Sequence, residues 1–117
     1  MTPLARHASG HGAEGVVARH YATRGYHVDR RRWRGLSGEI DLILRRGGEI
    51  VFVEVKSAPT LTRAAERIGP RQIARILAAA AEFLEGEPAR GLTPARVDAA
   101  LVDRSGRVEI LENACAA

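Results

Sequence analysis

Four charged residues interrupt two apolar segments that look like neighbouring strands. Glu39 and Asp41 lie in residues 39–45, and Glu54 and Lys56 lie in residues 49–57. Charges within a buried strand are costly unless they are paired or bind a metal. Carboxylates with an amine nearby could hold a divalent cation and activate a water molecule. These residues are therefore the first candidates for a functional site.

The two glycines at residues 47–48 predict a two-residue turn between the segments, which sets their register. In that register Asp41 lies opposite Glu54 and Glu39 lies opposite Lys56, so all four share one face of the sheet. The other face would be wholly aliphatic, and we expect it to be the core face. Its members are Ile40, Leu42, Leu44, Val51, Val53 and Val55.

Two facing carboxylates repel each other, so a cation between them is favourable. Lys56 supplies part of that charge, and Mg²⁺ or Mn²⁺ would supply more, because both ions prefer oxygen ligands. Zinc is disfavoured, since the cluster has no cysteine or histidine. The alternative is a salt-bridged surface hairpin, in which each pair contributes about 1 kcal/mol or less.

Lys56 is the only lysine among 18 basic residues, so the other 17 are arginine. This composition uses arginine wherever a generic positive charge is sufficient. A compact ammonium occurs only beside the acids, and arginine does not replace it there, because a guanidinium does not release its proton in proteins.

The pattern along the chain predicts an α/β fold with a mixed central β-sheet of about five strands flanked by helices. Apolar spacings of three and four indicate helices, and alternation indicates strands. The expected order is α-β-β-β-α-β-β, in a single domain of residues 1–117 with flexible ends at 1–10 and 113–117. The segments are helix 12–24, strands 26–33, 39–45 and 49–57, a loop, helix 70–84, and a hairpin of 95–103 with 107–111.

Charge and composition suggest the class of partner. The net charge is +4, and the excess lies in the first half of the chain, largely in residues 29–35. A basic patch suggests a polyanion such as nucleic acid, and a solvated arginine-rich loop is the alternative.

No segment is apolar enough for a membrane helix, no secretory signal is visible, and Cys115 is alone, so we expect a cytoplasmic protein.

Asp41, then twelve intervening residues, then Glu54-Val55-Lys56 resembles the PD-(D/E)xK signature of restriction-endonuclease-like nucleases. The fuller pattern resembles the YraN-like UPF0102 family across residues 10 to 103. That resemblance rests on Glu14, residues 38–43, residues 52–56, Arg71-Gln72, and Arg96 with Asp98. The chain departs from the family pattern at Ser57-Ala58 and at Arg71. The layout is also similar to that of archaeal Holliday junction resolvases.

The resemblance implies a restriction-endonuclease-like (tRNA-endonuclease-like) fold and a catalytic set of Glu14, Asp41, Glu54 and Lys56. Asp41, Glu54 and the Val55 carbonyl would hold Mg²⁺ or Mn²⁺, Lys56 would act on the attacking water, and Glu39 would support Lys56. Nucleic acid, with DNA as the expected form, would be the partner, and a homodimer is a further expectation because resolvase-like relatives dimerise. The residues expected to contact it are Arg30, Arg31, Arg32, Arg34, Arg71 and Gln72.

Two functions follow as expectations. The first is a divalent-metal-dependent endonuclease that acts on phosphodiester bonds, with branched DNA as a candidate substrate. The second is a non-catalytic nucleic-acid-binding protein that retains the nuclease fold. A purely structural subunit is a third alternative, and it predicts neither metal binding nor nucleic-acid binding.

Overall fold

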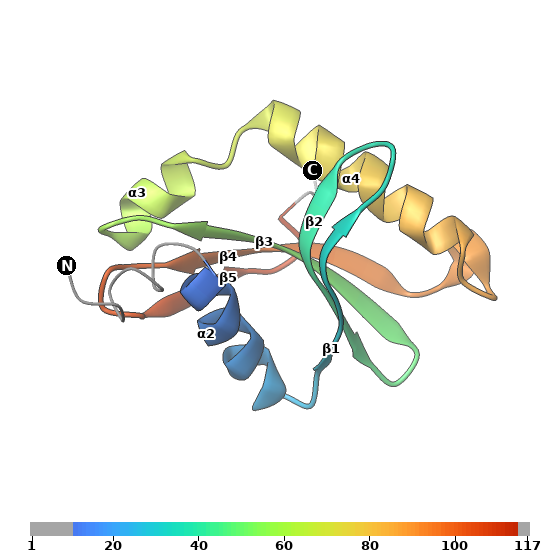
Figure 1. Ribbon diagram of the computed structural model, residues 1–117, viewed down its shortest axis with the longest axis horizontal. Coiled ribbons are helices and arrows are strands. Elements are labelled where there is room, and N and C mark those ends of the chain that lie inside the picture. Colours follow the sequence, from blue (N-terminus) through green and yellow to red (C-terminus); the bar gives the residue numbers. More distant parts are fainter. Residues whose placement is uncertain (1–10, 115–117) are drawn as a thin grey trace.

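A five-stranded sheet lies between helices in the computed structural model, which describes residues 11–114 (Figure 1). Residues 1–10 and 115–117, with Cys115 and most of the predicted flexible ends, lie outside the described residues. The elements are α2 (His11–Ala22), β1 (His27–Arg34), β2 (Glu39–Arg46), β3 (Glu49–Ser57), α3 (Leu61–Glu66), α4 (Pro70–Glu85), η1 (Arg90–Leu92), β4 (Ala95–Val102) and β5 (Val108–Leu111).

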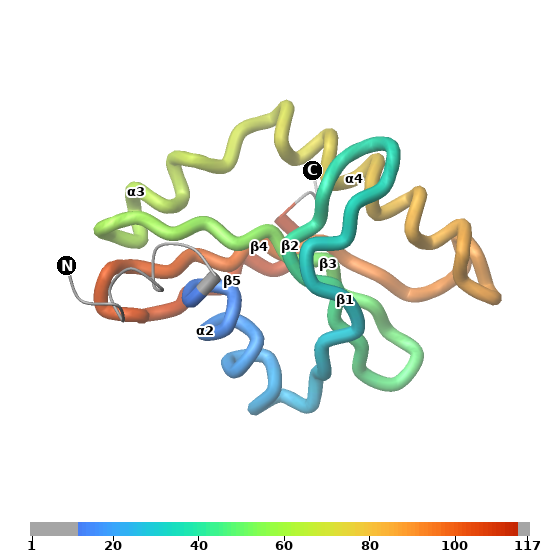
Figure 2. Tube along the Cα trace, viewed as in Figure 1, coloured from blue at the N-terminus to red at the C-terminus, as the bar shows by residue number. Residues whose placement is uncertain are grey.

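The strand order is β1-β2-β3-β4-β5, and the sheet is mixed. The first three strands form an antiparallel meander, β3 and β4 are parallel, and β4 and β5 are antiparallel. A parallel pair needs a crossover connection, and α3 and α4 provide it on one face of the sheet, as the trace in Figure 2 shows. The predicted five-stranded mixed sheet flanked by helices is therefore confirmed.

The predicted loop after β3 contains a short helix, α3, that sequence periodicity did not indicate. Thr60 caps its start, because the Thr60 side chain accepts a hydrogen bond from the Arg63 amide at 3.1 Å. Ala64 is fully buried, and the Arg67 guanidinium donates to the Ser57 carbonyl at 2.7 Å. Six residues are too few to display an apolar stripe, and for this reason the segment resembles a loop.

Both faces of the sheet are core, which corrects the prediction of a single core face. On one face α2 packs through Ala13, Val17 and Tyr21. On the other face α4 packs through four buried residues, and Ile43 and Phe52 are fully buried beneath it. The charged residues therefore occupy only the end of a face that is otherwise apolar. The buried α4 residues are Ile76, Ala79, Ala80 and Phe83.

The β2–β3 register is the predicted one over the paired part of the two strands. Partners run from Arg46 with Glu49 to Leu42 with Val53, and the pairing ends there. Beyond that point β2 stays with β1, through Ile40 opposite Trp33, while β3 continues beside β4. Ile40 consequently belongs to the core that is covered by α4, whereas Leu42 belongs to the core that is covered by α2. The separation of β2 from β3 opens the sheet where the acidic residues lie.

A buried aspartate holds the C-terminal segment against the sheet. The Asp98 side chain is fully buried and accepts hydrogen bonds from the Tyr21 hydroxyl at 2.6 Å and from Arg96 Nε at 2.9 Å. It also accepts from the Asn113 amide at 2.9 Å, and the Ala114 amide donates to the Val97 carbonyl. Asn113 and Ala114, which we predicted to be flexible, are therefore tied to β4.

None of the helices between residues 11 and 114 has the length and apolar character that crossing a membrane requires.

Candidate active site

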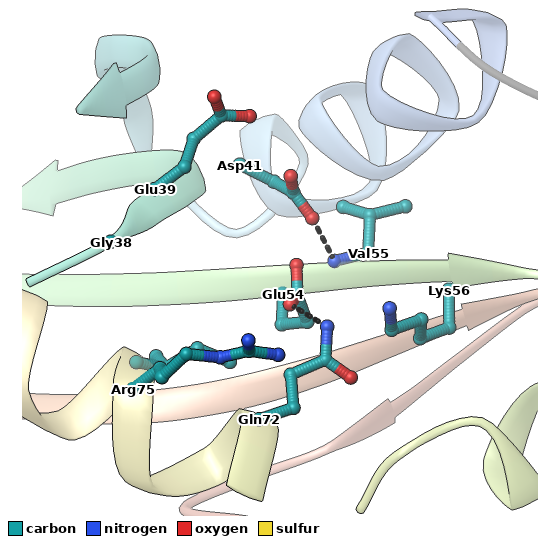
Figure 3. Close-up of a pocket in the computed structure, with 9 residues that line it drawn as sticks. Gly38, Glu39, Asp41, Glu54, Val55, Lys56, Gln72 and Arg75 are labelled. Atoms are coloured by element: carbon teal, nitrogen blue, oxygen red, sulfur yellow. Dashed lines mark hydrogen bonds between the residues drawn. The ribbon is translucent and has the colours of Figure 1, made fainter.

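A cleft of about 380 Å³ opens between the diverging ends of β2 and β3 and the first turns of α4. We call it the carboxylate cleft. Figure 3 shows the Asp41 and Glu54 side chains directed toward each other across it. Its lining residues are Gly38, Glu39, Asp41, Glu54, Val55, Lys56, Gln72, Arg75 and Ile76.

Asp41 is fixed by the backbone of the neighbouring strand. Its Oδ2 accepts a hydrogen bond from the Val55 amide at 2.8 Å. Pairing between β2 and β3 stops at Leu42, the residue that follows Asp41, so the Asp41 carboxylate takes the place of a main-chain acceptor for Val55. This hydrogen bond occupies Oδ2 and holds the Asp41 side chain in the lining of the cleft.

Glu54 is the most perturbed acid of the cleft. Its Oε2 accepts a hydrogen bond from Gln72 Nε2 at 2.5 Å. The pKa of Glu54 is raised to about 8, first by burial and then by a hydrogen bond to Asp41 and by the charge of Asp41. The charge of Lys56 and the Gln72 hydrogen bond act in the opposite direction. The ionised form of Glu54 is therefore disfavoured beside Asp41, and a nearby cation would favour it.

The donor set fits a hard divalent cation of the Mg²⁺ or Mn²⁺ type. Mg²⁺ is commonly held by one or two carboxylates, with waters and substrate phosphates completing its shell. Asp41 and Glu54 each keep one oxygen that is not used by Val55 or Gln72. Zinc does not fit, because the lining has no histidine or cysteine. Across residues 11–114 no group of three or more histidine, cysteine or acidic side chains converges, so any ion would depend on these two carboxylates.

Glu14 and Glu39 form ion pairs with arginines of β1. Glu14 is not among the residues that line the cleft, and its Oε1 lies 3.4 Å from Arg32 Nε. Glu39 lines the cleft, yet its carboxylate points away from Glu54 (Figure 3) and lies 3.0 Å from Arg34 Nη2. The prediction that Glu39 pairs with Lys56 is therefore wrong. Its cause is the separation of the strands, which ends the register that would have placed Glu39 opposite Lys56.

Most of the predicted nucleic-acid-binding arginines of β1 have a carboxylate partner. Arg30 pairs with Asp29 at 3.4 Å, and Arg32 and Arg34 pair with the two glutamates described above. Arg31 is exposed, and within residues 11–114 it has no ion pair. The positive charge of this strand is thus partly neutralised locally. Trp33, which is adjacent, packs edge-on against Phe83 in the core at 5.3 Å between ring centroids.

The start of α4 contributes side chains that the sequence only partly identified. Arg71 is exposed and does not line the cleft. Gln72 was predicted to contact phosphate, and in the structure it binds Glu54. Arg75 lines the cleft and was not predicted. Arg75 follows Gln72 by three residues, so the two side chains lie on the same side of the helix. This spacing could have predicted that Arg75 lies near the cleft.

The family of the chain follows from its similarity to known sequences. The model of the Uncharacterised protein family UPF0102 matches residues 13–102. The chain belongs to the UPF0102 family. A UPF0102 protein of Ruegeria pomeroyi is 60% identical over 92% of this chain and 88% of its own length. A UPF0102 protein of Cereibacter sphaeroides is 53% identical over the full length of both chains.

The UPF0102 match spans every residue of the carboxylate cleft, together with Glu14 and Asp98. Among solved structures, a protein of unknown function from Silicibacter pomeroyi is similar with a TM-score of 0.41 and 23% identity, over 86% of this chain and 67% of that one. A likeness this distant does not classify the fold. The names of these two UPF0102 relatives state no activity.

Proposed function

We propose that the protein is a divalent-metal-dependent endonuclease that hydrolyses phosphodiester bonds of nucleic acid. The observation that carries the proposal is the convergence of Asp41, Glu54 and Lys56 in one cleft, with the pKa of Glu54 raised to about 8. Perturbed carboxylates in a cleft are typical of functional sites. The PD-(D/E)xK pattern of these residues supports the same reaction class.

The residues of the cleft would divide the work in the following way. Asp41 and Glu54 would hold Mg²⁺ or Mn²⁺, and the Val55 carbonyl is the third ligand that the PD-(D/E)xK resemblance implies. A divalent ion in this position supplies positive charge to a phosphate oxygen and lowers the pKa of a bound water. Lys56 would orient the attacking water and stabilise the charge that develops on the phosphate. Arg75, which has no ion pair within residues 11–114, would hold a neighbouring phosphate.

Gln72 would position Glu54. Its 2.5 Å hydrogen bond occupies one carboxylate oxygen and directs the other toward Asp41. Gln72 comes from α4, whereas Asp41 and Glu54 come from two different strands. The three elements therefore have to pack correctly before the two carboxylates can act together.

The experiment is a cleavage assay with a panel of single-stranded, duplex, flapped and four-way-junction DNA and the corresponding RNA, in Mn²⁺ and in EDTA. We expect cleavage in Mn²⁺ only, and loss of cleavage in Asp41→Asn and Lys56→Met. Lys56→Arg should recover part of the activity, because arginine restores the charge but does not release a proton as lysine can. Arg104→Ala, in the exposed β4–β5 turn, is the control and should cleave normally. Absence of cleavage on every substrate would refute the proposal.

A non-catalytic nucleic-acid-binding protein is the second candidate, and one observation favours it. Asp41 and Glu54 already satisfy one oxygen each within the protein, and no third acidic side chain joins them among the residues that the structure describes. This alternative predicts binding of nucleic acid in EDTA and in Mn²⁺ alike, with no cleavage and with no loss of affinity in Lys56→Arg.

A further inference from the structure

The connection between β1 and β2 holds a leucine entirely out in solvent. Leu36 is 100% exposed, and it lies between Gly35 and Gly38 at the tip of the hairpin. Single exposed apolar residues are common on protein surfaces and need no explanation by themselves. Leu36 differs from such residues because the backbone around it is fixed in place and lies beside the carboxylate cleft.

The Glu82 carboxylate of α4 holds this connection. Its Oε2 accepts a hydrogen bond from the Leu36 amide at 2.9 Å, and its Oε1 accepts from the Ser37 amide at 3.0 Å. The Gly35 amide also donates to the Gly38 carbonyl at 3.0 Å. A Cβ at Gly35 would lie 2.6 Å from Glu82 Oε2, so glycine permits the close approach. The tip is therefore a rigid turn, and the leucine side chain is its outermost part.

The same turn forms the rim of the carboxylate cleft. Gly38 lines the cleft, and a Cβ at that position would lie 3.9 Å from Arg75. Leu36 precedes Asp41 by five residues, so the two are at most about 17 Å apart along extended chain. Since bases repeat about every 3.4 Å along a strand, a nucleic acid held at the cleft would place Leu36 within about five base steps of the scissile phosphate.

We propose that Leu36 is a wedge that inserts between neighbouring base pairs, and that the substrate is duplex DNA whose stacking is already interrupted. Apolar side chains inserted between base steps unstack them, and unstacking costs least at a nick, flap or junction. Arg75 lies beside the tip, next to Gly38, and provides positive charge for an adjacent phosphate. The wedge rests on the endonuclease function proposed above, and it names the substrate class of that function.

The chain offers a matched control in Leu92. This residue is 88% exposed, lies in η1, and does not line the cleft. Leu36→Ala and Leu92→Ala remove the same side chain from two exposed positions, so neither should unfold the protein. Leu36→Met keeps an apolar side chain of similar size and should preserve the wedge.

The first measurement is the fluorescence of 2-aminopurine placed at the junction of a nicked duplex, with protein added in EDTA. Unstacking raises this fluorescence, and we expect the rise with the wild type, Leu36→Met and Leu92→Ala. Leu36→Ala should lose most of it. The second measurement is the cleavage rate in Mn²⁺ on nicked, continuous and single-stranded DNA. Leu36→Ala should lose preference for nicked over continuous duplex by on the order of tenfold, with cleavage of single strands unchanged.

The outcomes separate the wedge from the nuclease. Wild-type cleavage with an unchanged substrate preference in Leu36→Ala overturns the wedge and leaves the nuclease. A fluorescence rise that depends on Leu36, without cleavage by any variant, supports the wedge and refutes the nuclease. Equal effects of Leu36→Ala and Leu92→Ala would show that surface hydrophobicity alone is responsible, which overturns the wedge.

Discussion

Replacing Glu54 by glutamine tests whether the two carboxylates of the cleft are strained when no cation lies between them. The pKa of Glu54 is about 8 in the folded protein, mainly because of burial and secondly because of Asp41, against an ordinary value of 4.5. The folded state therefore keeps a proton that the unfolded chain releases. Stability from this group is fully present below pH 4.5 and is lost as the pH rises through about 8. Glutamine resembles the protonated acid and does not titrate.

The pKa of Glu54 is about 3.5 higher in the folded protein than its ordinary value. This difference corresponds to at most about 4.8 kcal/mol of destabilisation at alkaline pH. Glu54 is only partly buried, and solvent screens the strain, so we expect roughly half of that value, about 2 kcal/mol. For a domain of this length, that free energy corresponds to a rise of about 8 °C in Tm. Glu54→Gln should therefore melt about 8 °C above the wild type at pH 8.5 and at the same temperature near pH 4.5.

The assay is thermal unfolding followed by circular dichroism between pH 4.5 and 8.5, in EDTA and then with excess Mn²⁺. Mn²⁺ should raise the Tm of the wild type, because a ligand of the folded state stabilises it, and should not raise that of Glu54→Gln. Glu85→Gln, at the exposed end of α4, is the control and should follow the wild type. Parallel pH curves for the wild type and Glu54→Gln would refute the reasoning about strain. An equal effect of Mn²⁺ on both would show that Glu54 does not hold the metal.

Three further predictions concern the parts of the fold that position the cleft. Asp98→Ala should lose about 3–5 kcal/mol in urea denaturation, because it leaves the buried Tyr21 hydroxyl and the partly buried Arg96 guanidinium without their carboxylate. A loss below 1 kcal/mol would contradict this account. Gly38→Ala should lower the free energy of unfolding by about 1 kcal/mol or more in the same urea assay, because the backbone φ of 152° at that position is strained for alanine. Unchanged stability would show that the turn relaxes to accept the side chain. Glu82→Ala should speed amide exchange at residues 36–37, which donate to its carboxylate, and exchange as slow as in the wild type would show that the turn does not need this anchor.

The paired part of the central hairpin could be predicted because its determinants are local. Two glycines set the turn, and Gly47 has a positive φ of 60° that suits glycine. The register from Arg46 with Glu49 to Leu42 with Val53 follows from this turn. The bounds of β3 could also be predicted, because a continuous apolar run ends in charges on both sides.

The burial of the second sheet face could not be inferred from the hairpin alone. Ile43 and Phe52 are covered only because α4 packs on them, after a crossover that joins β3 to a parallel β4. The ion pair between Glu39 and Arg34 could not be predicted for a similar reason. It depends on the β1–β2 register, which shifts between Val28 and Arg30 and cannot be derived from the alternation of apolar and polar residues.

Because β3 pairs in parallel with β4, the first half of the chain cannot build the carboxylate cleft by itself. Glu54 lies beside Ala99, forty-five residues later, and Gln72 comes from the crossover between them. A growing chain that has reached Ser57 already contains Asp41, Glu54 and Lys56, yet β3 still has an open edge and uncovered apolar side chains. Completion of β4 during synthesis therefore acts as a checkpoint, and until that strand docks the ribosome-bound protein is expected to be inert and in need of protection from aggregation.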